Sequence, residues 1–247
     1  MAITKAKVTT LPAAISILMP VCNEAEVLED VIEEWVRDVF QYLPEGSELV
    51  IDEAASTDGT REILQRLCQK YPFIRVKYNE TKDGFAAAAR SLYQEARCPL
   101  VFFTDSDGQY VPSEFWKLVP FVGEFSLVHG AKIGRQDPFF RKVASAIFNR
   151  IARFLFDVHY SDINSAFRII RTDLVRELLP QLHCMPTLLN AELLLRAELD
   201  NRSIKQVHVI HRHRLKGTSR GLPASTFIKE SMAAYRGLCA LKAEYKS

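Results

Sequence analysis

Short apolar runs and amphipathic helical patterns alternate along the first half of the chain. Runs rich in β-branched and aromatic residues predict buried strands at 15–21, 47–52, 73–79 and 99–105. Between these runs apolar residues recur at helical spacing and predict helices over 24–43, 57–71 and 84–96. Strands that alternate with helices of this length imply βαβ crossovers. The pattern therefore predicts an α/β fold with a mostly parallel sheet flanked by helices.

The second half of the chain is less regular. It contains two strand-like runs, a basic amphipathic segment and a helical pattern, at 126–132, 206–214, 139–158 and 187–199 respectively. A helix of mixed charge is predicted for the last residues, 223–247. Because no internal repeat or linker interrupts the chain, we expect a single domain over residues 1–222 followed by this helical tail.

Composition narrows the class of protein. The chain has 247 residues, of which 48% are hydrophobic and 25% are charged, the balance of a soluble globular protein. The formal net charge of +2 gives no bulk electrostatic reason to expect nucleic-acid binding. Five scattered cysteines, the lack of a secretory signal pattern and the lack of an apolar run of about 18 residues predict a cytoplasmic protein with reduced thiols.

Polar residues follow each of the first four predicted strands, at Cys22–Glu24, Asp52–Ser56, Asn79–Gly84 and Asp105–Gln109. The carboxyl ends of parallel strands meet at one edge of an open sheet, where ligands bind. Two carboxylates one residue apart, such as Asp105 and Asp107, can share a divalent ion with a diphosphate. Mg²⁺ and Mn²⁺ favour such oxygen ligands. The four strand ends therefore predict a metal-assisted nucleotide site.

Each of these residues also has a purely structural interpretation. Asp, Ser and Gly favour turns through their own chemistry, so Asp105 and Asp107 alone indicate a metal site only weakly. Asn23 with Glu24 can cap the helix that follows them, and Asp58 can cap the next one. The functional interpretation therefore depends on the four strand ends taken together.

Five segments carry a family resemblance: MPVCNEAEVLEDVI, DEAASTDGT, VFFTDSDGQY, SDINSAFRIIRTD and HRHRLKGTS. They occur in the order seen in glycosyltransferase family 2, and the chain resembles in particular the polyprenyl-phosphate glycosyltransferases, the group that contains dolichol-phosphate mannose synthase. The resemblance covers roughly residues 13–220. It implies a Rossmann-like GT-A fold and an inverting transfer of a sugar from a nucleotide-diphosphate donor, with Mg²⁺ or Mn²⁺ as the metal.

The resemblance also implies roles for individual residues on the donor side. Residues of the first two strand ends would form the pocket for base and ribose: Pro20, Asn23, Glu24, Asp52, Glu53 and Asp58. Asp105, Asp107 and Gln109 would hold the metal and the diphosphate. Basic positions near the nucleotide or a lipid phosphate would be Lys82, Arg135 and Arg141, because arginine binds phosphate in a bidentate way. A solvated surface arginine is the alternative for any one of them.

The second strand end departs from the family pattern, which has two adjacent aspartates before G-S-x-D-G-T. Aligning on Ser56–Thr60 places Glu53 and Ala54 at the pair and Ala55 where glycine is usual. Aligning on the strand instead pairs Asp52 with Glu53 and adds a residue to the loop. Both alignments alter base recognition and leave UDP and GDP as alternatives.

The later segments would supply the acceptor side. Asp162 is the candidate general base for a hydroxyl acceptor, whereas a phosphate acceptor is already anionic and would need Asp162 only to orient groups. Arg168 and Glu192 are further candidates for substrate binding, although a helix glutamate is more often solvated. His211, Arg214 and Ser219 match the family's H-x-x-R-x-x-G-x-S segment, a loop that would close over the diphosphate and bring Arg214 to the leaving group. Without the resemblance this loop is a basic surface segment.

The basic segment 139–158 combines arginines with phenylalanines, which is typical of a helix at a membrane interface. An ordinary helix that covers the sheet is the alternative. We therefore expect a polyprenyl phosphate acceptor and a peripheral location at the cytosolic face of the membrane, through direct contact or a membrane-protein partner. A homo-oligomer is left open.

Two rival functions fit the same residues. The first keeps the transfer chemistry but uses a soluble hydroxyl acceptor, such as a glycan or a polysaccharide. The second is a non-catalytic nucleotide-sugar-binding module, in which the altered Asp52–Ser56 strand end marks lost activity. The joint presence of Asp105, Asp107, Gln109 and Arg214 argues against the second, because binding alone needs no clamp on a leaving group.

Overall fold

The computed structural model describes residues 10–134, 139–214 and 224–245. Within them the chain forms one sheet of seven strands: β1 (Ile15–Val21), β2 (Glu48–Ala54), β3 (Ile74–Asn79), β4 (Leu100–Phe103), β5 (Leu127–Ile133), β6 (Arg168–Arg171) and β7 (Ile204–Ile210). The helices are α1 (Leu28–Asp38), α2 (Thr60–Lys70), α3 (Phe85–Glu95), α4 (Phe139–Phe156), α5 (Thr172–Leu178), α6 (Leu189–Leu199) and α7 (Ala224–Glu244). Short 3₁₀ turns occupy Phe40–Tyr42, Pro112–Lys117, Val119–Phe121 and Leu179–Gln181.

The strand order is β3-β2-β1-β4-β6-β5-β7. Strands β1 to β4 pair in parallel, which confirms the mostly parallel sheet predicted from the alternating pattern. Strand β6 runs antiparallel between β4 and β5, and β7 pairs with β5 in parallel. Because β6 is antiparallel to both neighbours, β5 points the same way as β4. The carboxyl ends of six strands, β1 to β5 and β7, therefore lie at one edge of the sheet.

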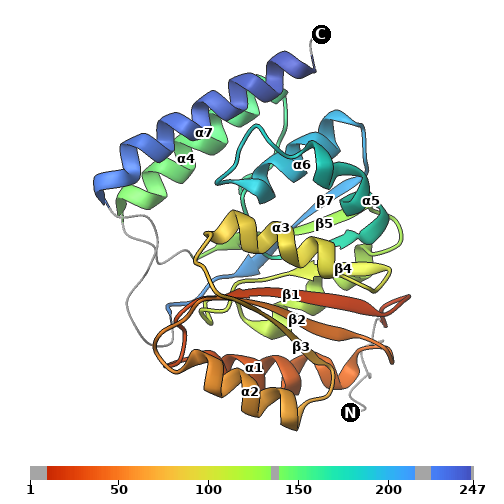
Figure 1. The fold of residues 1–247 in the computed structure, drawn as a ribbon. Coiled ribbons are helices and arrows are strands. Elements are labelled where there is room, and N and C mark those ends of the chain that lie inside the picture. Colours follow the sequence, from red (N-terminus) through yellow and green to blue (C-terminus); the bar gives the residue numbers. More distant parts are fainter. Residues whose placement is uncertain (1–9, 135–138, 215–223, 246–247) are drawn as a thin grey trace.

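Helices cover both faces of this sheet (Figure 1). Helices α1 and α2 lie on one side of β1 to β3, and α3 packs on β1 and β2 from the other side. The core between sheet and helices is aromatic: Phe102 meets Trp35, Phe115 and Phe167 at ring-centroid distances of 5.4, 5.0 and 4.7 Å. All four side chains are buried, and burial of each such ring contributes roughly 1.5–3 kcal/mol.

Several predicted boundaries shift in the structure. The helix expected from residue 24 begins only at Leu28, because the N–H groups of Val27 and Leu28 both bond the Glu24 carbonyl in a turn. The strand expected over 206–214 ends at Ile210. Neither β6 nor α5 was predicted, because four residues in β6 and seven in α5 are too few to display a period.

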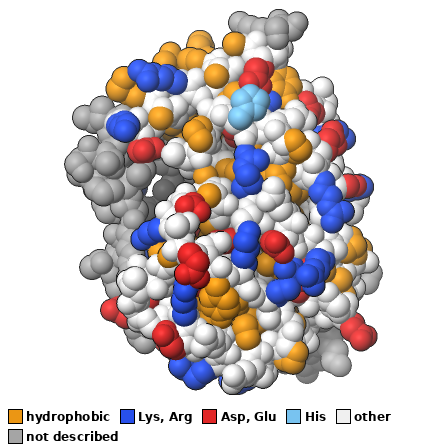
Figure 2. All heavy atoms as spheres, in the orientation of Figure 1, with side chains coloured by type: hydrophobic (Ala, Val, Ile, Leu, Met, Phe, Trp, Pro, Cys, Tyr) orange, Lys and Arg blue, Asp and Glu red, His pale blue; other side chains and the backbone are white. Residues whose placement is uncertain are grey.

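The basic segment forms α4 and the tail forms α7, and the two helices lie side by side along one edge of the molecule (Figure 1). Apolar side chains exposed on the pair include Ile147, Phe154, Met232 and Tyr235, with Phe154 87% exposed. On the face seen in Figure 2, acidic and basic side chains are interspersed, while hydrophobic and basic side chains lie together at the upper left. No described helix is long and apolar enough to cross a bilayer.

Helix α7 is seated on the rest of the fold. Leu238 and Leu241 are fully buried, and Gly237 approaches the loop before α6 so closely that a Cβ there would lie 2.5 Å from the Cys184 carbonyl oxygen. Tyr245 adds a hydrogen bond to Asp200 at 3.0 Å. The predicted tail therefore packs against the same body that carries the sheet.

Candidate active site

A cavity of about 290 Å³ opens at the carboxyl edge of the sheet. All four predicted polar strand ends contribute to its lining, which includes Pro20, Cys22, Glu24, Ala54, Lys82, Gly84, Asp105 and Asp107. Phe85 and Ala88 at the start of α3 add an apolar wall. A larger cavity of about 460 Å³ lies around Pro12 and Leu100 at the opposite edge, where the acid in its lining, Asp173, is paired with Arg171. The smaller cavity is therefore the candidate active site.

Asp105 and Asp107 form the acidic side of this cavity. Burial raises the pKa of Asp105 to about 7, and the neighbouring charge of Asp107 adds to the shift. Burial also raises the pKa of Asp107, although its Oδ1 accepts a hydrogen bond from the Gln109 N–H at 3.0 Å. Two crowded carboxylates at the rim of a cavity favour a cation between them. Their oxygen atoms suit Mg²⁺ or Mn²⁺, so the residues present fit the metal that the family resemblance implies.

Two cationic side chains lie next to the acids. Arg214 forms an ion pair with Glu24, and its Nη1 lies 3.7 Å from Asp107 Oδ2. Lys132, near the end of β5, places its Nζ 3.7 Å from Asp162 Oδ2, and its charge partly offsets the raised pKa of Asp105. Asp162 also accepts the backbone N–H of Lys132 at 3.3 Å. Arg214 therefore contacts the acid pair directly, whereas Asp162 contacts Lys132, whose charge acts on Asp105.

Lys132 itself was missed by the sequence reasoning. It lies in the predicted strand 126–132, but the sequence does not reveal that β5 points the same way as β1 to β4. Once β6 is placed between β4 and β5, the carboxyl end of β5 joins the same edge as the four polar strand ends. A lysine near the end of such a strand is then expected beside the acids.

Other predicted residues hold the loops of the cavity in place. Asn23, whose φ is +54°, accepts the Thr57 N–H on its Oδ1 at 2.7 Å and donates its own N–H to Ser56 Oγ at 2.7 Å. Asp58 accepts the N–H groups of Thr60 and Ala25, both at 3.2 Å. These bonds join the β1–α1 and β2–α2 loops, so Asn23 and Asp58 shape the cavity from behind its lining.

The acids of β2 are turned inward. Glu53 is fully buried, and its two oxygens accept the Arg61 Nε and the Ser56 N–H, each at 2.6 Å. Asp52 is also buried and accepts the Asn79 side-chain amide at 2.7 Å, while burial raises its pKa. Neither residue lines the cavity, where Ala54 stands instead.

Ala55 identifies the better of the two alignments at this strand end. Its φ of +49° lies in the left-handed region that favours glycine. Aligning on Ser56–Thr60 places Ala55 where the family pattern has glycine. The backbone therefore keeps the glycine conformation with an alanine in place, and the pair position in the cavity lining is Ala54.

Replacing Ala55 with glycine should stabilise the protein. A Cβ in the left-handed region destabilises the folded state by about 1–2 kcal/mol, and glycine removes this strain. The greater conformational freedom of glycine in the unfolded chain offsets about 0.4–1 kcal/mol of the stabilisation. We expect Ala55→Gly to raise the free energy of unfolding by about 0.5–1 kcal/mol in urea titrations. The matched control is Ala54→Gly in β2, which should lose about 0.5–1 kcal/mol. A loss of stability in Ala55→Gly would contradict the assigned conformation.

Two predicted substrate-binding residues are buried elsewhere in the fold. Arg168 is completely buried, and its guanidinium donates to the carbonyls of Ser165 at 2.9 Å and Asn190 at 2.7 Å. Glu192 is 1% exposed and pairs with Arg196 at 2.9 Å. Both side chains hold the fold together and neither lines the cavity.

The remaining predicted residues are placed as follows. Gln109 turns its side-chain amide to the Arg212 carbonyl at 3.4 Å. His211 is buried with its ring edge against Tyr110, at a centroid distance of 5.1 Å. The side chains of Arg135, Arg141 and Ser219 lie outside the described residues.

In open α/β sheets ligands bind beyond the carboxyl ends of the strands, which is where the acid pair lies. The chain belongs to glycosyl transferase family 2, whose family model matches residues 16–179. This match confirms the family that the five quoted segments indicated.

The sequence identity to individual curated relatives is below 30% in the two examples that follow. The chain is 27% identical over 209 residues to an undecaprenyl-phosphate 4-deoxy-4-formamido-L-arabinose transferase of Pectobacterium carotovorum, covering 83% of this chain and 62% of that protein. It is 29% identical over 163 residues to the glycosyltransferase AglJ of Haloferax volcanii, covering 64% of this chain and 50% of that protein. The chain thus spans only part of the length of these curated relatives.

A solved structure shows the same fold. Glucosyl-3-phosphoglycerate synthase of Mycobacterium tuberculosis, in complex with Mn²⁺, UDP and glucosyl-3-phosphoglycerate, superposes with a TM-score of 0.71 at 20% identity. The match covers 94% of this chain and 81% of that one. The likeness confirms the GT-A fold that the resemblance implied.

Proposed function

We propose that this glycosyltransferase moves a sugar from a nucleotide-diphosphate donor, with inversion, to a polyprenyl phosphate. The observation that carries the donor half is the Asp105–Asp107 pair at the rim of the cavity, with Arg214 3.7 Å from Asp107. An acid pair with raised pKa values and an adjacent arginine suits a diphosphate held through a divalent ion. Support comes from the solved relative, whose complex contains Mn²⁺ and UDP.

The cavity has an apolar part, suited to the base and ribose of a donor, and a charged part, suited to its diphosphate. Phe85, Ala88 and Pro20 offer apolar surface for the base and ribose. When bound at Asp105 and Asp107, a Mg²⁺ or Mn²⁺ ion would neutralise charge on the leaving diphosphate. The guanidinium of Arg214 would add positive charge at the same place. The ion pair with Glu24 holds the Arg214 guanidinium at the cavity.

The acceptor half rests on α4 and on the curated relatives. The α4 segment Phe139–Phe156 has four basic residues and no acidic one. Ile147 and Phe154 are exposed on the same helix. A basic helix with exposed apolar side chains suits an anionic membrane surface, which supports a peripheral location. The first of the relatives described above is named for transfer involving undecaprenyl phosphate, a lipid phosphate presented at such a surface.

A soluble hydroxyl acceptor is the second candidate, and Asp162 favours it. This carboxylate is 5% exposed, and its Oδ2 lies 3.7 Å from the Nζ of Lys132, whose charge also lowers the pKa of Asp105. A hydroxyl acceptor needs a general base, and such a base contributes about 10²–10⁴ to the rate. A phosphate acceptor is already anionic and needs none.

The acceptor can be assigned by one assay with two variants. Transfer from a panel of nucleotide sugars is measured with polyprenyl phosphate and with hydroxyl acceptors, using wild type and Asp162→Asn. We expect turnover with polyprenyl phosphate and a loss of less than about tenfold in Asp162→Asn, because no base is required. Turnover with a hydroxyl acceptor alone, together with a loss of about 10²-fold or more in the variant, would overturn the lipid acceptor in favour of the second candidate. Donor binding without turnover would support the non-catalytic module.

A further inference from the structure

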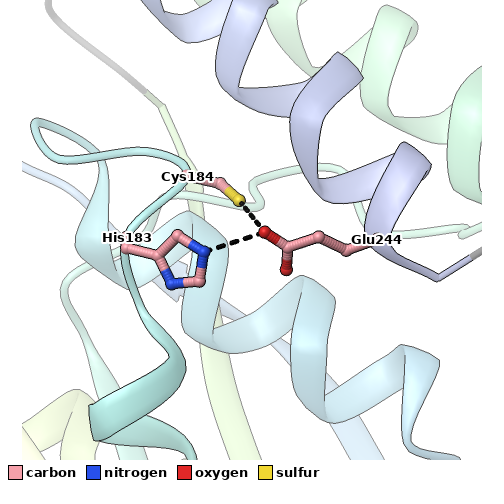
Figure 3. Close-up of side chains that lie close together, drawn as sticks. All are labelled: His183, Cys184 and Glu244. Carbon is pink, nitrogen blue, oxygen red and sulfur yellow. Dashed lines mark hydrogen bonds and ion pairs between the residues drawn. The ribbon is translucent and has the colours of Figure 1, made fainter.

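A second group of metal-type ligands lies where α7 meets the loop before α6 (Figure 3). His183 and Cys184 come from that loop, and Glu244 is the last residue of α7. One ligand atom from each residue, nitrogen, sulfur or oxygen, lies within 4.8 Å of the other two. His183 Nε2 is 2.8 Å from Glu244 Oε1, and Cys184 Sγ is 3.1 Å from the same oxygen. None of the three residues lines the cavity of the candidate active site.

We propose that His183, Cys184 and Glu244 bind one Zn²⁺ ion that fastens α7 to the body of the enzyme. Zinc favours nitrogen, sulfur and carboxylate oxygen ligands, at about 2.0–2.3 Å in a tetrahedron. Three protein ligands with a water molecule in the fourth position are the coordination set of catalytic zinc sites, and the same set would hold the ion here. On binding, the Cys184 thiol would lose its proton to solvent and the sulfur would coordinate as thiolate. Soft sulfur also separates this site from the all-oxygen pair Asp105 and Asp107.

The loop that carries His183 and Cys184 is held by a buried carboxylate. Glu192 accepts the backbone N–H groups of His183 and Cys184 at 3.0 Å each, and that of Met185 at 2.7 Å. Three consecutive N–H groups on one carboxylate fix the backbone from which both ligands project. Metal sites depend on such support, because it sets the orientation of the ligands before the ion arrives.

Arg196 orients the third ligand. Its Nη2 donates to Glu244 Oε2 at 2.9 Å, which leaves Oε1 facing His183 and Cys184. The positive charge of Arg196 is balanced by Glu192, with which it forms a buried ion pair at 2.9 Å. With the Cys184 thiolate and Glu244 added, a bound Zn²⁺ leaves the whole group without net charge. The adjacent arginine is therefore compatible with a bound cation.

The position of α7 is fixed independently of Glu244. The close approach of Gly237 to the Cys184 carbonyl sets the helix against the loop two turns before its end. Glu244 thus reaches the other two ligands from a helix already seated beside them. A zinc ion there would fasten the same helix that lies along α4, so it would stabilise the helical pair as a unit.

Cobalt substitution tests the site by a readout that does not depend on transfer activity. The full chain is titrated with Co²⁺, and thiolate-to-cobalt absorption is recorded together with Zn²⁺ displacement and metal content. We expect one equivalent of thiolate-bound Co²⁺, displaced by Zn²⁺, and a Zn²⁺-dependent rise in the unfolding temperature. The same absorption should persist in Asp107→Asn, which separates this site from the catalytic one and from the proposed function.

Matched variants decide the outcome. Cys184→Ser should abolish the absorption and the Zn²⁺-dependent stabilisation, and Glu244→Gln should weaken both at least tenfold. Cys239→Ser, an exposed cysteine on the same helix, should retain them. If Cys184→Ser does not fold, His183→Ala carries the test, because that side chain is 64% exposed. Thiolate absorption that is absent in wild type, or unchanged in Cys184→Ser or His183→Ala, would overturn the proposal. His183, Cys184 and Glu244 would then be a group of hydrogen-bonded side chains that binds no metal.

Discussion

Asp105→Asn should strongly reduce metal-dependent transfer and at the same time make the metal-free protein more stable. The carboxylate is held where burial and the charge of Asp107 raise its pKa to about 7. The fold therefore disfavours the charged form that a metal requires. Asparagine removes the charge and keeps the shape. We expect a loss of transfer of about 10²–10³-fold or more, the usual cost of removing one electrostatic group from an active site.

The stability gain has a definite pH dependence. The pKa of Asp105 is about 7 in the folded protein, whereas an ordinary aspartate, as in the unfolded chain, has a pKa of 3.8. The folded state therefore binds the proton more tightly than the unfolded state does. The stability from this protonation is fully present below about pH 4 and is lost as the pH rises through about 7. In urea titrations with EDTA, the gap between Asp105→Asn and wild type should therefore widen from pH 5 to pH 8. A shift of roughly 2–4 °C in unfolding temperature corresponds to about 1 kcal/mol at this chain length.

A control with the opposite sign is available in the same protein. Asp173 is exposed, and its ion pair with Arg171 lowers its pKa. Asp173→Asn should therefore be slightly less stable than wild type at pH 8 and similar to it at low pH. Two results would contradict a raised pKa for Asp105. In the first, Asp105→Asn is no more stable than wild type at pH 8. In the second, the difference in stability between variant and wild type is the same at pH 5 and pH 8.

The second large effect is expected at Glu192, on stability. Glu192→Gln removes the buried charge partner of Arg196, which keeps only its ion pair with the more exposed Glu244, and weakens the acceptor for three backbone N–H groups. Removing one partner of a buried ion pair costs about 3–5 kcal/mol. We expect a loss of that size in the free energy of unfolding, measured in urea. Glu177→Gln, which breaks the exposed pair with Arg202, should cost less than about 1 kcal/mol.

This variant also distinguishes the two roles considered for Glu192. A structural role predicts a large loss of stability and, in the folded fraction, little change in the KM for either substrate. A substrate-binding role predicts the reverse: near-normal stability and a raised KM. A loss of stability below about 1 kcal/mol would contradict the buried network described here.

Much of the fold was predictable because its first half obeys clear periods. Strands β1 to β4 are buried runs separated by amphipathic helices, so both the parallel sheet and the edge at which its polar ends meet follow from the pattern. The acid pair was predictable for the same reason. Asp105 and Asp107 follow β4, whose burial is indicated by its apolar run and whose direction is indicated by the helix that precedes it.

What the sequence did not predict depends on contacts between distant segments. A motif fixes a residue's place in the chain but not which way its side chain turns. Arg168 and Glu192 therefore looked like ligand-binding residues, although both bond the backbone of neighbouring loops inside the core. Lys132 was overlooked because its relation to the acids depends on β6, a strand of four residues inserted antiparallel between β4 and β5.

Nucleotide binding in the presence and absence of the metal tests the metal-diphosphate site directly. UDP and GDP are titrated by calorimetry into wild type and Asp107→Asn, each with Mn²⁺ and with EDTA. We expect at least one nucleotide to bind wild type tenfold or more tightly with Mn²⁺ than with EDTA, and Asp107→Asn to lose this gain. Equal affinity with Mn²⁺ and EDTA, or a gain that survives in Asp107→Asn, would contradict the assignment of Asp105 and Asp107 as the metal-diphosphate site.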